Sequence, residues 1–266
     1  MSRLRMRQIC LVARQLEPVV GELSSTLGLE VCHRDPGVGK YGLENALFPM
    51  GDQFLEVVAP VREGTTAGRY LDRRGGDGGY MVITQCEDLA ARRKRCEALG
   101  VRVANEIGHP EYRELQLHPR DVGAAMLSFG WQAGARYPGG PWHPAAWRGA
   151  ALRDASAGRG AAEGEPSAFQ KSSAANEPSA IVGISAAELQ SDDPERLARR
   201  WSEVIERPVE TRDGQRVIVL DDATLRFTEA TDGRGEGLGG LDLACPAPGR
   251  VGLVQICGIR FRLTRP

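Results

Sequence analysis

An internal repeat in the first half of the chain restricts its fold more than any other feature. A short apolar run at 9–13 is followed by a segment, 16–27, whose apolar residues recur at the spacing of one helix face, and Gly28 ends it. About 73 residues later the same order returns: an apolar run at 81–84, a helical segment and then Gly100. A chain that repeats strand, helix and glycine in this order is expected to repeat a supersecondary unit.

Each copy continues into further strands. The chain leaves the helix through a short extended segment, 29–31 in the first copy and 101–103 in the second. Two more runs of strand-forming residues follow in each copy, separated by short turns. These runs are 43–48, 53–58, 112–117 and 124–129. The pattern predicts a βαβββ unit that is present twice, over 5–60 and 78–131.

A third copy follows after a gap. Its helix is expected to begin at Asp193 and Pro194, a cap followed by a first helical residue. Its strands are expected at 180–184, 216–220 and 224–228. The residues that remain are too few for a complete fourth unit, so we expect only its first and last strands, at 241–244 and 259–263. The sequence therefore predicts an α+β fold of tandem βαβββ units.

The stretch between the second and third copies has the composition of a linker. Residues 132–179 are rich in Ala, Gly, Ser and Pro and show no apolar periodicity. This linker would divide the chain into a first domain, 1–131, with two complete units, and a second region, 180–266, whose last unit is truncated.

Composition and charge exclude several classes of partner. The formal net charge is -1, from 34 basic and 35 acidic residues, so no basic surplus points to nucleic acid. No stretch approaches the ~20 consecutive apolar residues of a membrane span, and the basic N-terminus lacks the apolar run of a signal peptide. The 6 cysteines show no Cys-x-x-Cys spacing and are expected to be reduced, buried thiols. These observations favour a cytoplasmic protein whose partner is a small molecule, with no nucleic acid and no membrane.

Three segments carry a family resemblance. They are Gln-Ile-Cys-Leu-Val at 8–12 before a helix, Gly-Asp-Gln-Phe-Leu-Glu-Val-Val-Ala-Pro at 51–60, and His-Pro-Arg-Asp-Val-Gly at 118–123. With the order of the units, they resemble the vicinal oxygen chelate superfamily, which includes glyoxalases, methylmalonyl-CoA epimerases, extradiol dioxygenases and bleomycin-resistance proteins. The resemblance implies a glyoxalase-like fold in which paired units form cupped mixed sheets. A shared fold does not by itself specify the chemistry.

The resemblance also implies positions for a metal site. In the superfamily, a divalent metal lies in the cup, held by one residue from the first strand and one from the last strand of each unit. In the first unit these positions fall on Gln8 and Glu56, whose amide and carboxylate oxygens suit a hard or borderline cation. In the second unit they fall on Met81, where the family has His, and on Ser128, where it has Glu.

Glu56 and His118 are the candidate catalytic residues. Glu56 is a carboxylate in an otherwise apolar strand and needs a partner or a raised pKa, and Gln8 is an alternative partner to a metal. His118 could act as a ligand or general base near its ordinary pKa of ~6.5, or could cap the turn before Pro119. The candidate substrate-binding residues in the cup are Asn45, Phe54, Tyr80, Met81, Ser128 and Trp131.

Two classes of function stay open at this point. The resemblance implies an enzyme, a lyase, isomerase or related activity, that acts on a small oxygenated metabolite in the cup of the N-terminal domain, with one divalent metal ion as its only cofactor. The alternative is a metal-free protein of the bleomycin-resistance type that binds or sequesters a small molecule. The retained Gln8 and Glu56 favour the enzyme, whereas the missing His and Glu of the second unit favour the binding protein. A homodimer is also left open.

Overall fold

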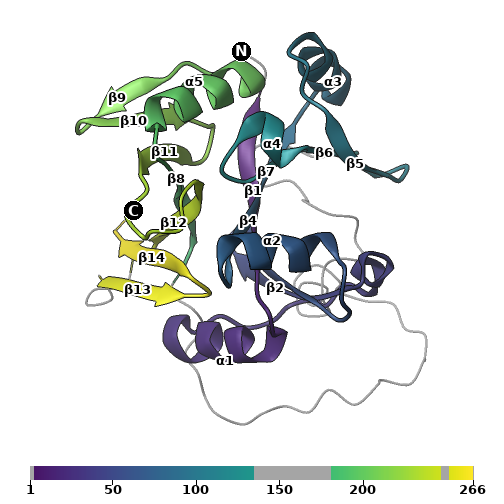
Figure 1. The fold of residues 1–266 in the computed structure, drawn as a ribbon, viewed down its shortest axis with the longest axis vertical. Helices are drawn as coiled ribbons and strands as arrows, with labels where there is room; N and C mark the ends of the chain where they lie inside the picture. Colours follow the sequence, from purple (N-terminus) through teal and green to yellow (C-terminus); the bar gives the residue numbers. More distant parts are fainter. Residues whose placement is uncertain (1–2, 135–180, 247–251, 266) are drawn as a thin grey trace, which may run out of the picture.

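The computed structural model describes residues 3–134, 181–246 and 252–265. In these ranges the chain forms an α+β fold with two mixed seven-stranded sheets (Figure 1). The predicted linker, 132–179, lies outside the described residues from position 135 onward. None of the helices in the described ranges is long and apolar enough to cross a membrane.

The first sheet is formed by the N-terminal half of the chain. Its strands are β1 (Leu4–Val12), β2 (Leu43–Met50), β3 (Gln53–Pro60), β4 (Gly78–Cys86), β5 (Val103–Gly108), β6 (Tyr112–Leu117) and β7 (Met126–Gln132). They lie in the order β2-β3-β1-β4-β7-β6-β5. The antiparallel pair β1 and β4 is central, with β3 parallel to β1 and β7 parallel to β4.

The second sheet repeats this arrangement in the C-terminal half. Its strands are β8 (Gly183–Ser191), β9 (Glu210–Arg212), β10 (Gln215–Val219), β11 (Thr224–Glu229), β12 (Gly237–Ala244), β13 (Gly252–Ile256) and β14 (Ile259–Thr264). They lie in the order β13-β14-β12-β8-β11-β10-β9. Here β8 and β12 form the central antiparallel pair, with β11 parallel to β8 and β14 parallel to β12.

The two sheets also share a register. Each central ladder is interrupted by two β-bulges, at matching places. In the ladder of β1 and β4, the interruptions lie between Met6 and Gln8 and between Cys10 and Leu11. In the ladder of β12 and β8, they lie between Leu238 and Gly240 and between Asp242 and Leu243. Aligning the ladders matches Gln8 with Ala186 and Cys10 with Glu188. Because a strand turns successive side chains to opposite faces, this register also fixes which residues of the two sheets occupy equivalent positions.

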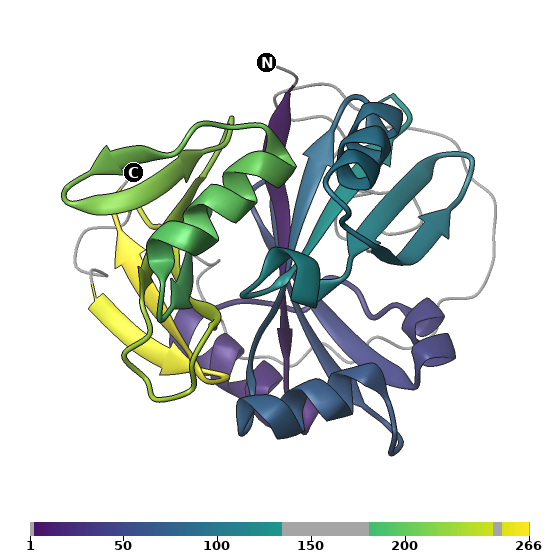
Figure 2. The same cartoon turned by 45° about the horizontal axis from the view of Figure 1, so that its top comes forward.

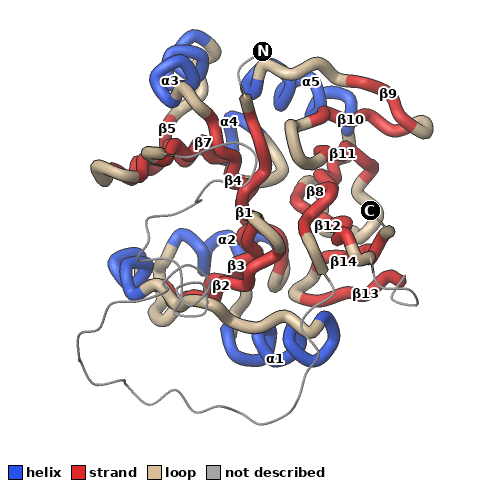
Figure 3. The backbone as a smooth tube through the Cα atoms, turned by 180° about the vertical axis from the view of Figure 1, so that it is seen from behind, coloured by secondary structure: helices blue, strands red, loops and turns tan. Residues whose placement is uncertain are grey.

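One apolar core lies between the two sheets. Leu55 and Val57 of β3 point into it from the first sheet, and Leu225 and Phe227 of β11 point into it from the second. Figures 1 and 3 show the two halves side by side from opposite sides. The helices and the 3-10 turn in the described ranges are α1 (Leu16–Leu27), η1 (Pro36–Tyr41), α2 (Thr66–Arg74), α3 (Leu89–Ala98), α4 (Pro119–Val122) and α5 (Pro194–Ile205) (Figure 2).

One close approach between the two sheets lies at a glycine. A Cβ atom on Gly79 of β4 would lie 2.5 Å from the side chain of Leu238 on β12, well inside van der Waals contact. The absence of a side chain at Gly79 therefore lets Leu238 pack directly against the first sheet. Gly79 and Leu238 occupy equivalent positions of the two ladders. At this position the first sheet has no side chain, and the second sheet has a large one.

The face of each sheet that is turned away from this core carries the candidate site residues. We call these the first outer face and the second outer face. The first outer face holds a separate apolar cluster, to which Ala67 and Leu71 of α2 contribute. It is the face on which the family resemblance places the cup.

The first unit departs from the predicted pattern in its second strand. Residues 29–31, expected to be extended, form no strand, and only His33 makes an isolated bridge, to Leu47. The chain turns away because the Asp35 side chain accepts a hydrogen bond from the Gly37 backbone and begins the turn η1 at Pro36. Turn-forming residues here override the strand preference of 29–31.

The helix ends agree with the sequence, but helix α2 was not predicted, and the short helix α4 forms where only a turn was expected. Gly28 and Gly100 both adopt the left-handed conformation, with φ of 67° and 65°, as glycines do at helix ends. Helix α2 lies in a connection for which no element was expected. Its signals were present: Thr65 caps it by accepting from the Gly68 backbone at 2.9 Å, and Leu71 lies four residues after Ala67 on its buried side.

Candidate functional site

A buried carboxylate on β3 is the centre of the first outer face. Glu56 is only 7% exposed, because the alternation of β3 turns Phe54, Glu56 and Val58 to this face. Gln8 Nε2 donates to Glu56 Oε2 at 2.7 Å, and Asn45 Nδ2 donates to Glu56 Oε1 at 2.6 Å. The structure thus brings together three of the predicted site residues, one from each of β1, β2 and β3.

The orientation of Asn45 is set by the backbone. Its Oδ1 accepts a hydrogen bond from the Asp35 N–H at 2.7 Å, so its Nδ2 is left to face Glu56. This bond also ties the turn before η1 to the site. Asn45 therefore acts through its amide nitrogen, holding one carboxylate oxygen in place.

Burial raises the pKa of Glu56 above its ordinary value. Hydrogen bonds from Asn45, Cys10 and Gln8 to the carboxylate work in the opposite direction, and the nearby charge of Glu114 raises the pKa further. The net shift of the Glu56 pKa is upward, because burial outweighs the hydrogen bonds to the carboxylate. Burial also raises the pKa of the Cys10 thiol, which stays protonated and unsuited to nucleophilic attack.

A second carboxylate, Glu114, faces the same site and was not predicted. It is 3% exposed and lies on β6, where it accepts a hydrogen bond from the Tyr112 hydroxyl at 2.5 Å and another from Gln116 Nε2 at 3.2 Å. The register places it at the position in the second unit that Asn45 has in the first. The sequence contained a signal for Glu114: it lies in a strand with several apolar residues, two positions after Tyr112, so both side chains point to the same face.

The wall of the first outer face is apolar. Phe54, Tyr80 and Met81, three of the predicted substrate-binding residues, belong to it or pack against it. The buried members of this cluster are Cys10, Val12, Val58, Ala67, Leu71, Tyr80, Met81, Ile83, Tyr112 and Met126. A ligand that reaches Glu56 would therefore meet mostly hydrocarbon and a few fixed polar atoms, as is usual for small-molecule sites.

The remaining predicted site residues are distributed differently. Ser128 is paired with Ile83 and is fully buried, and its Oγ has no hydrogen-bond partner in the described part of the protein. Trp131 lies on the opposite face of β7 from Met126, with the Arg113 guanidinium 5.6 Å from the centre of its ring. The structure therefore does not place Trp131 in the wall of this site.

His118 is positioned at the start of α4 rather than with Glu56. Its Nδ1 accepts a hydrogen bond from the Arg120 N–H at 3.3 Å and lies 3.4 Å from the Arg102 guanidinium. This is the turn-capping role that the sequence left open beside the catalytic one. The His118 ring therefore lies against Arg102 and Arg120 rather than against Glu56.

The sequence of the chain matches a known domain family. The sequence model of the glyoxalase-like domain family matches residues 9–205, more than half of the 266 residues. The chain belongs to this family. The family resemblance predicted from the sequence is thereby confirmed.

Several proteins are similar to this glyoxalase-like protein. A crystal structure of a hypothetical protein from Staphylococcus aureus covers 99% of both chains with a TM-score of 0.67 and 14% identity, a likeness that shows a shared fold. An ethylmalonyl-CoA/methylmalonyl-CoA epimerase from Cereibacter sphaeroides is 24% identical over 127 residues, 46% of this chain and 94% of that protein. A methylmalonyl-CoA epimerase in complex with methylmalonyl-CoA and NH4+ is 25% identical, with a TM-score of 0.45, covering 50% of this chain and 97% of that one.

The glyoxalase-like protein does not have a fitting ligand set at the four positions that the superfamily uses for metal. Both oxygens of Glu56 accept amide N–H groups, and Gln8 turns its Nε2 toward that carboxylate. Met81 and Ser128 offer a thioether and a hydroxyl, both weak ligands for a hard cation. Within the described ranges, no group of three or more His, Cys, Asp or Glu could hold a metal ion. We therefore derive no chemical step through a metal, and the divalent ion stays a prediction.

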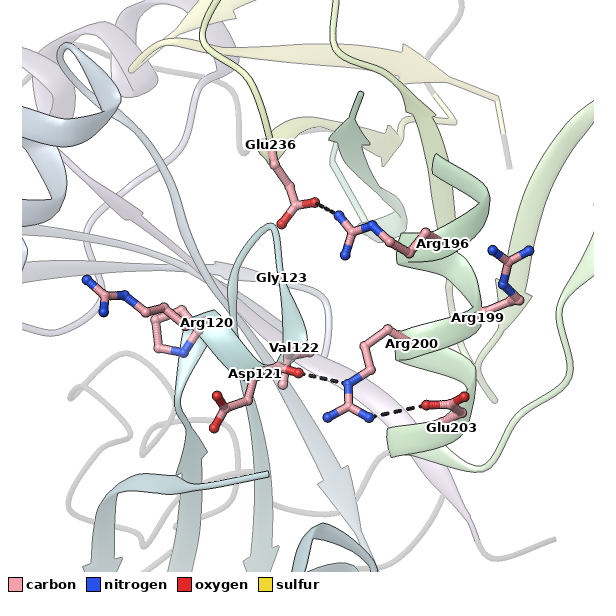
Figure 4. Close-up of a pocket in the computed structure, with 10 residues that line it drawn as sticks. Arg120, Asp121, Val122, Gly123, Arg196, Arg199, Arg200, Glu203 and Glu236 are labelled. Carbon is pink, nitrogen blue, oxygen red and sulfur yellow. Dashed lines mark hydrogen bonds and ion pairs between the residues drawn. The ribbon is translucent and has the colours of Figure 1, made fainter. Parts of the chain in front are cut away.

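A separate cleft of about 330 Å³ lies where the two halves meet, between α4 and α5. Figure 4 shows its charged side chains, of which Arg196 reaches Glu236, and Arg200 lies between the Asp121 carbonyl and Glu203. These contacts join α5 to the loop around α4 and to the loop before β12. Two of the arginines that line the cleft are thus held by partners within the protein, and the cleft is a junction between the halves.

Proposed function

We propose that this protein is an enzyme that moves a proton on a small oxygenated metabolite at the first outer face. The observation that carries the proposal is the Glu56 carboxyl group, buried in an apolar wall, held through both oxygens by amide donors, and shifted upward in pKa. A carboxyl group of this kind has the fixed orientation and the driving force that general acid–base catalysis needs.

The proposed step is removal of a proton from the carbon next to a carbonyl group. Glu56 takes the proton, the electron pair of the C–H bond moves toward the carbonyl oxygen, and return of a proton to the carbon gives the isomer. Gln8 and Asn45 hold the carboxylate in place during both transfers. Glu114, which is separated from β3 by the three strands β1, β4 and β7 and whose charge acts on Glu56, exchanges a proton on the other side of the substrate.

The substrate class follows from the wall and from the relatives. The apolar wall suits a short hydrocarbon chain, and the acidity of a carbon next to a thioester carbonyl suits a base such as a carboxylate. The epimerase from Cereibacter sphaeroides is named for ethylmalonyl-CoA and methylmalonyl-CoA. We therefore take 2-alkylmalonyl thioesters, followed by small 2-oxo and 2-hydroxy carbonyl compounds, as the first substrates to test.

Exchange of the substrate hydrogen with solvent deuterium tests this proposal. The protein is incubated in D2O with methylmalonyl-CoA and with a panel of small carbonyl compounds, and deuterium in the substrate is followed by mass spectrometry. We expect exchange with at least one compound, and a loss of at least about 100-fold in Glu56→Gln. Glu106→Gln, which removes an exposed carboxylate on β5, is the matched control and should keep the wild-type rate. Exchange at equal rates in the wild type and Glu56→Gln would contradict the assignment.

A metal-free binding protein is the second candidate, and the observation that favours it is Met81 and Ser128 at two of the four metal positions. Such a protein would bind the same compounds without exchange. Calorimetric titration of the compounds that show no exchange distinguishes the two classes, because saturable binding without exchange identifies the binding protein. The metal content of protein purified without chelator tests the divalent ion directly.

A further inference from the structure

The second outer face has the topology of the first, but its central side chains are charged. Aligning the two central ladders identifies the equivalent positions. Cys10 of the first face corresponds to Glu188 of the second, and Ile83 corresponds to Asp242. Glu56 corresponds to Arg226, and Ser128 corresponds to Arg262. Both positions held by an acid or a hydroxyl in the first face are arginines in the second.

These residues form one connected network with a third arginine. Arg226 donates through both terminal nitrogens to the Asp242 carboxylate, and its Nη2 lies 3.4 Å from Glu188 Oε2. Arg262 Nη1 donates to Asp242 Oδ1 at 2.9 Å, and Arg260 Nη2 donates to Glu188 Oε1 at 2.5 Å. The two carboxylates are the buried members, since their side chains are 8% and 11% exposed.

The network is unbalanced in charge and in donors. Three guanidinium groups face two carboxylates, which leaves one positive charge in excess. Among the described residues, Arg226 uses both terminal nitrogens within the network, whereas Arg260 donates through Nη2 and Arg262 through Nη1, with Arg262 Nη2 4.0 Å from Glu188 Oε2. Arg260 and Arg262 are also the more exposed, at 27% and 46% of their side chains. Arg260 and Arg262 are therefore the members of the network that a ligand from solvent can reach most readily.

A glycine on β12 accommodates the side chains of this network. A Cβ atom on Gly239 would lie 2.3 Å from Gln190 Oε1 and 3.0 Å from Arg260 Nη2, so the bare backbone is what lets these side chains lie across β12. On the other side of Arg262, its strand neighbour Leu253 on β13 is 60% exposed. An exposed apolar side chain thus stands beside Arg262.

We propose that the second outer face binds a small molecule through an oxyanion group, a carboxylate or a phosphate, held by Arg260 and Arg262. A planar guanidinium edge with two N–H groups matches such a group in a bidentate manner. Glu188 and Asp242 are positioning residues: they fix the guanidinium groups and reduce the repulsion among them, so little order is lost when the anion binds. This site is separate from Glu56 and does not depend on the function proposed for the first outer face.

Calorimetric titration of the full chain with succinate and with inorganic phosphate tests the site. We expect saturable binding of at least one probe, and the stronger probe identifies the group. Arg260→Gln with Arg262→Gln should weaken that binding at least tenfold, because both anion-facing edges are removed. Arg199→Gln is the matched control: it removes an arginine on α5 that is 61% exposed, and it should leave the binding unchanged.

A single conservative change keeps the test decisive if the double variant folds poorly. Arg262→Lys keeps the charge but loses the planar edge, and it should weaken binding several-fold. Binding of neither probe by the wild type, or equal binding in the wild type and Arg262→Lys, would overturn the proposal.

Discussion

The first and second outer faces share strand order, bulges and register, yet they differ completely in chemistry. The first places the Glu56 carboxyl group, with Glu114 as the second carboxylate, among apolar side chains and amides. The second places two carboxylates and three guanidinium groups at its centre, with no comparable apolar cluster in the described ranges. The difference teaches that the fold is specified by the inner faces, which are apolar in both sheets, while the outer faces are left to vary.

The largest expected effect concerns the charged network. Asp242→Ala removes the carboxylate that holds both Arg226 and Arg262, and it should lower the free energy of unfolding by about 3 kcal/mol, because Arg226 is left partly buried without its main partner. The midpoint of urea unfolding measures this loss. Glu195→Ala, which breaks an exposed pair with Arg199 on α5, is the control and should cost less than about 1 kcal/mol. Equal midpoints for Asp242→Ala and the control would show that the network does not stabilise the second sheet.

An intermediate effect is expected where the inner faces meet. Gly79→Ala places a methyl group 2.5 Å from the Leu238 side chain, and this overpacking should cost about 1–3 kcal/mol. Combining it with Leu238→Ala makes room for the methyl group, so the double variant should lose less than the sum of the two single changes. Gly108→Ala, where no atom lies within 4 Å of the added carbon, is the control for a glycine in a strand. Strictly additive losses would mean that Gly79 and Leu238 are not in contact.

The smallest effect on stability, and the clearest dependence on pH, belongs to Glu56. Its folded pKa is raised above the ordinary 4.5, so the folded state binds this proton more tightly than the unfolded state. The stability gained from that proton is complete below about pH 4.5 and is lost as the pH rises through the folded pKa. Glu56→Gln removes this dependence.

Melting temperatures at pH 5 and pH 8 check the sign. The variant should differ from the wild type by less than about 1 kcal/mol at pH 5 and should be relatively more stable at pH 8, where the wild-type carboxylate is charged and buried. Glu106→Gln should show no such change between the two pH values. A variant that is relatively less stable at pH 8 would mean that its hydrogen-bond partners stabilise the charged form more than burial opposes it.

Much of the fold could be predicted from the sequence because the repeat is periodic. Recurrence of strand, helix and glycine predicted an α+β fold of βαβββ units, and the family resemblance implied that this fold is glyoxalase-like; the structure has two mixed seven-stranded sheets, and the chain belongs to the glyoxalase-like domain family. The expected remnants at 241–244 and 259–263 fall within β12 and β14. The second strand of the first unit was the exception, because the Asp35 and Pro36 turn is a local signal that the periodic pattern does not contain.

The site was predictable only in part. Gln8, Asn45 and Glu56 could be found because strand alternation and the family positions point to the same face. Glu114 was missed, because the family positions lie on the first and last strands of each unit, whereas Glu114 lies on a strand between them. The charged network was missed for a related reason: its members are spread over β8, β11, β12 and β14, and only the register of four strands shows that they meet.

The register shared by the two sheets has a practical consequence for engineering. An outward-pointing residue of either sheet can be exchanged without changing the residues that fill the core, since the strand alternation separates the two sets. The protein is thus a two-sided scaffold, in which one side can be redesigned as a receptor while the side chains of the other stay unchanged. Positions that are equivalent across the sheets, such as Glu56 and Arg226, can also be exchanged. The backbone geometry is the same at both positions, so the side chain of one sheet can be placed at the matching position of the other.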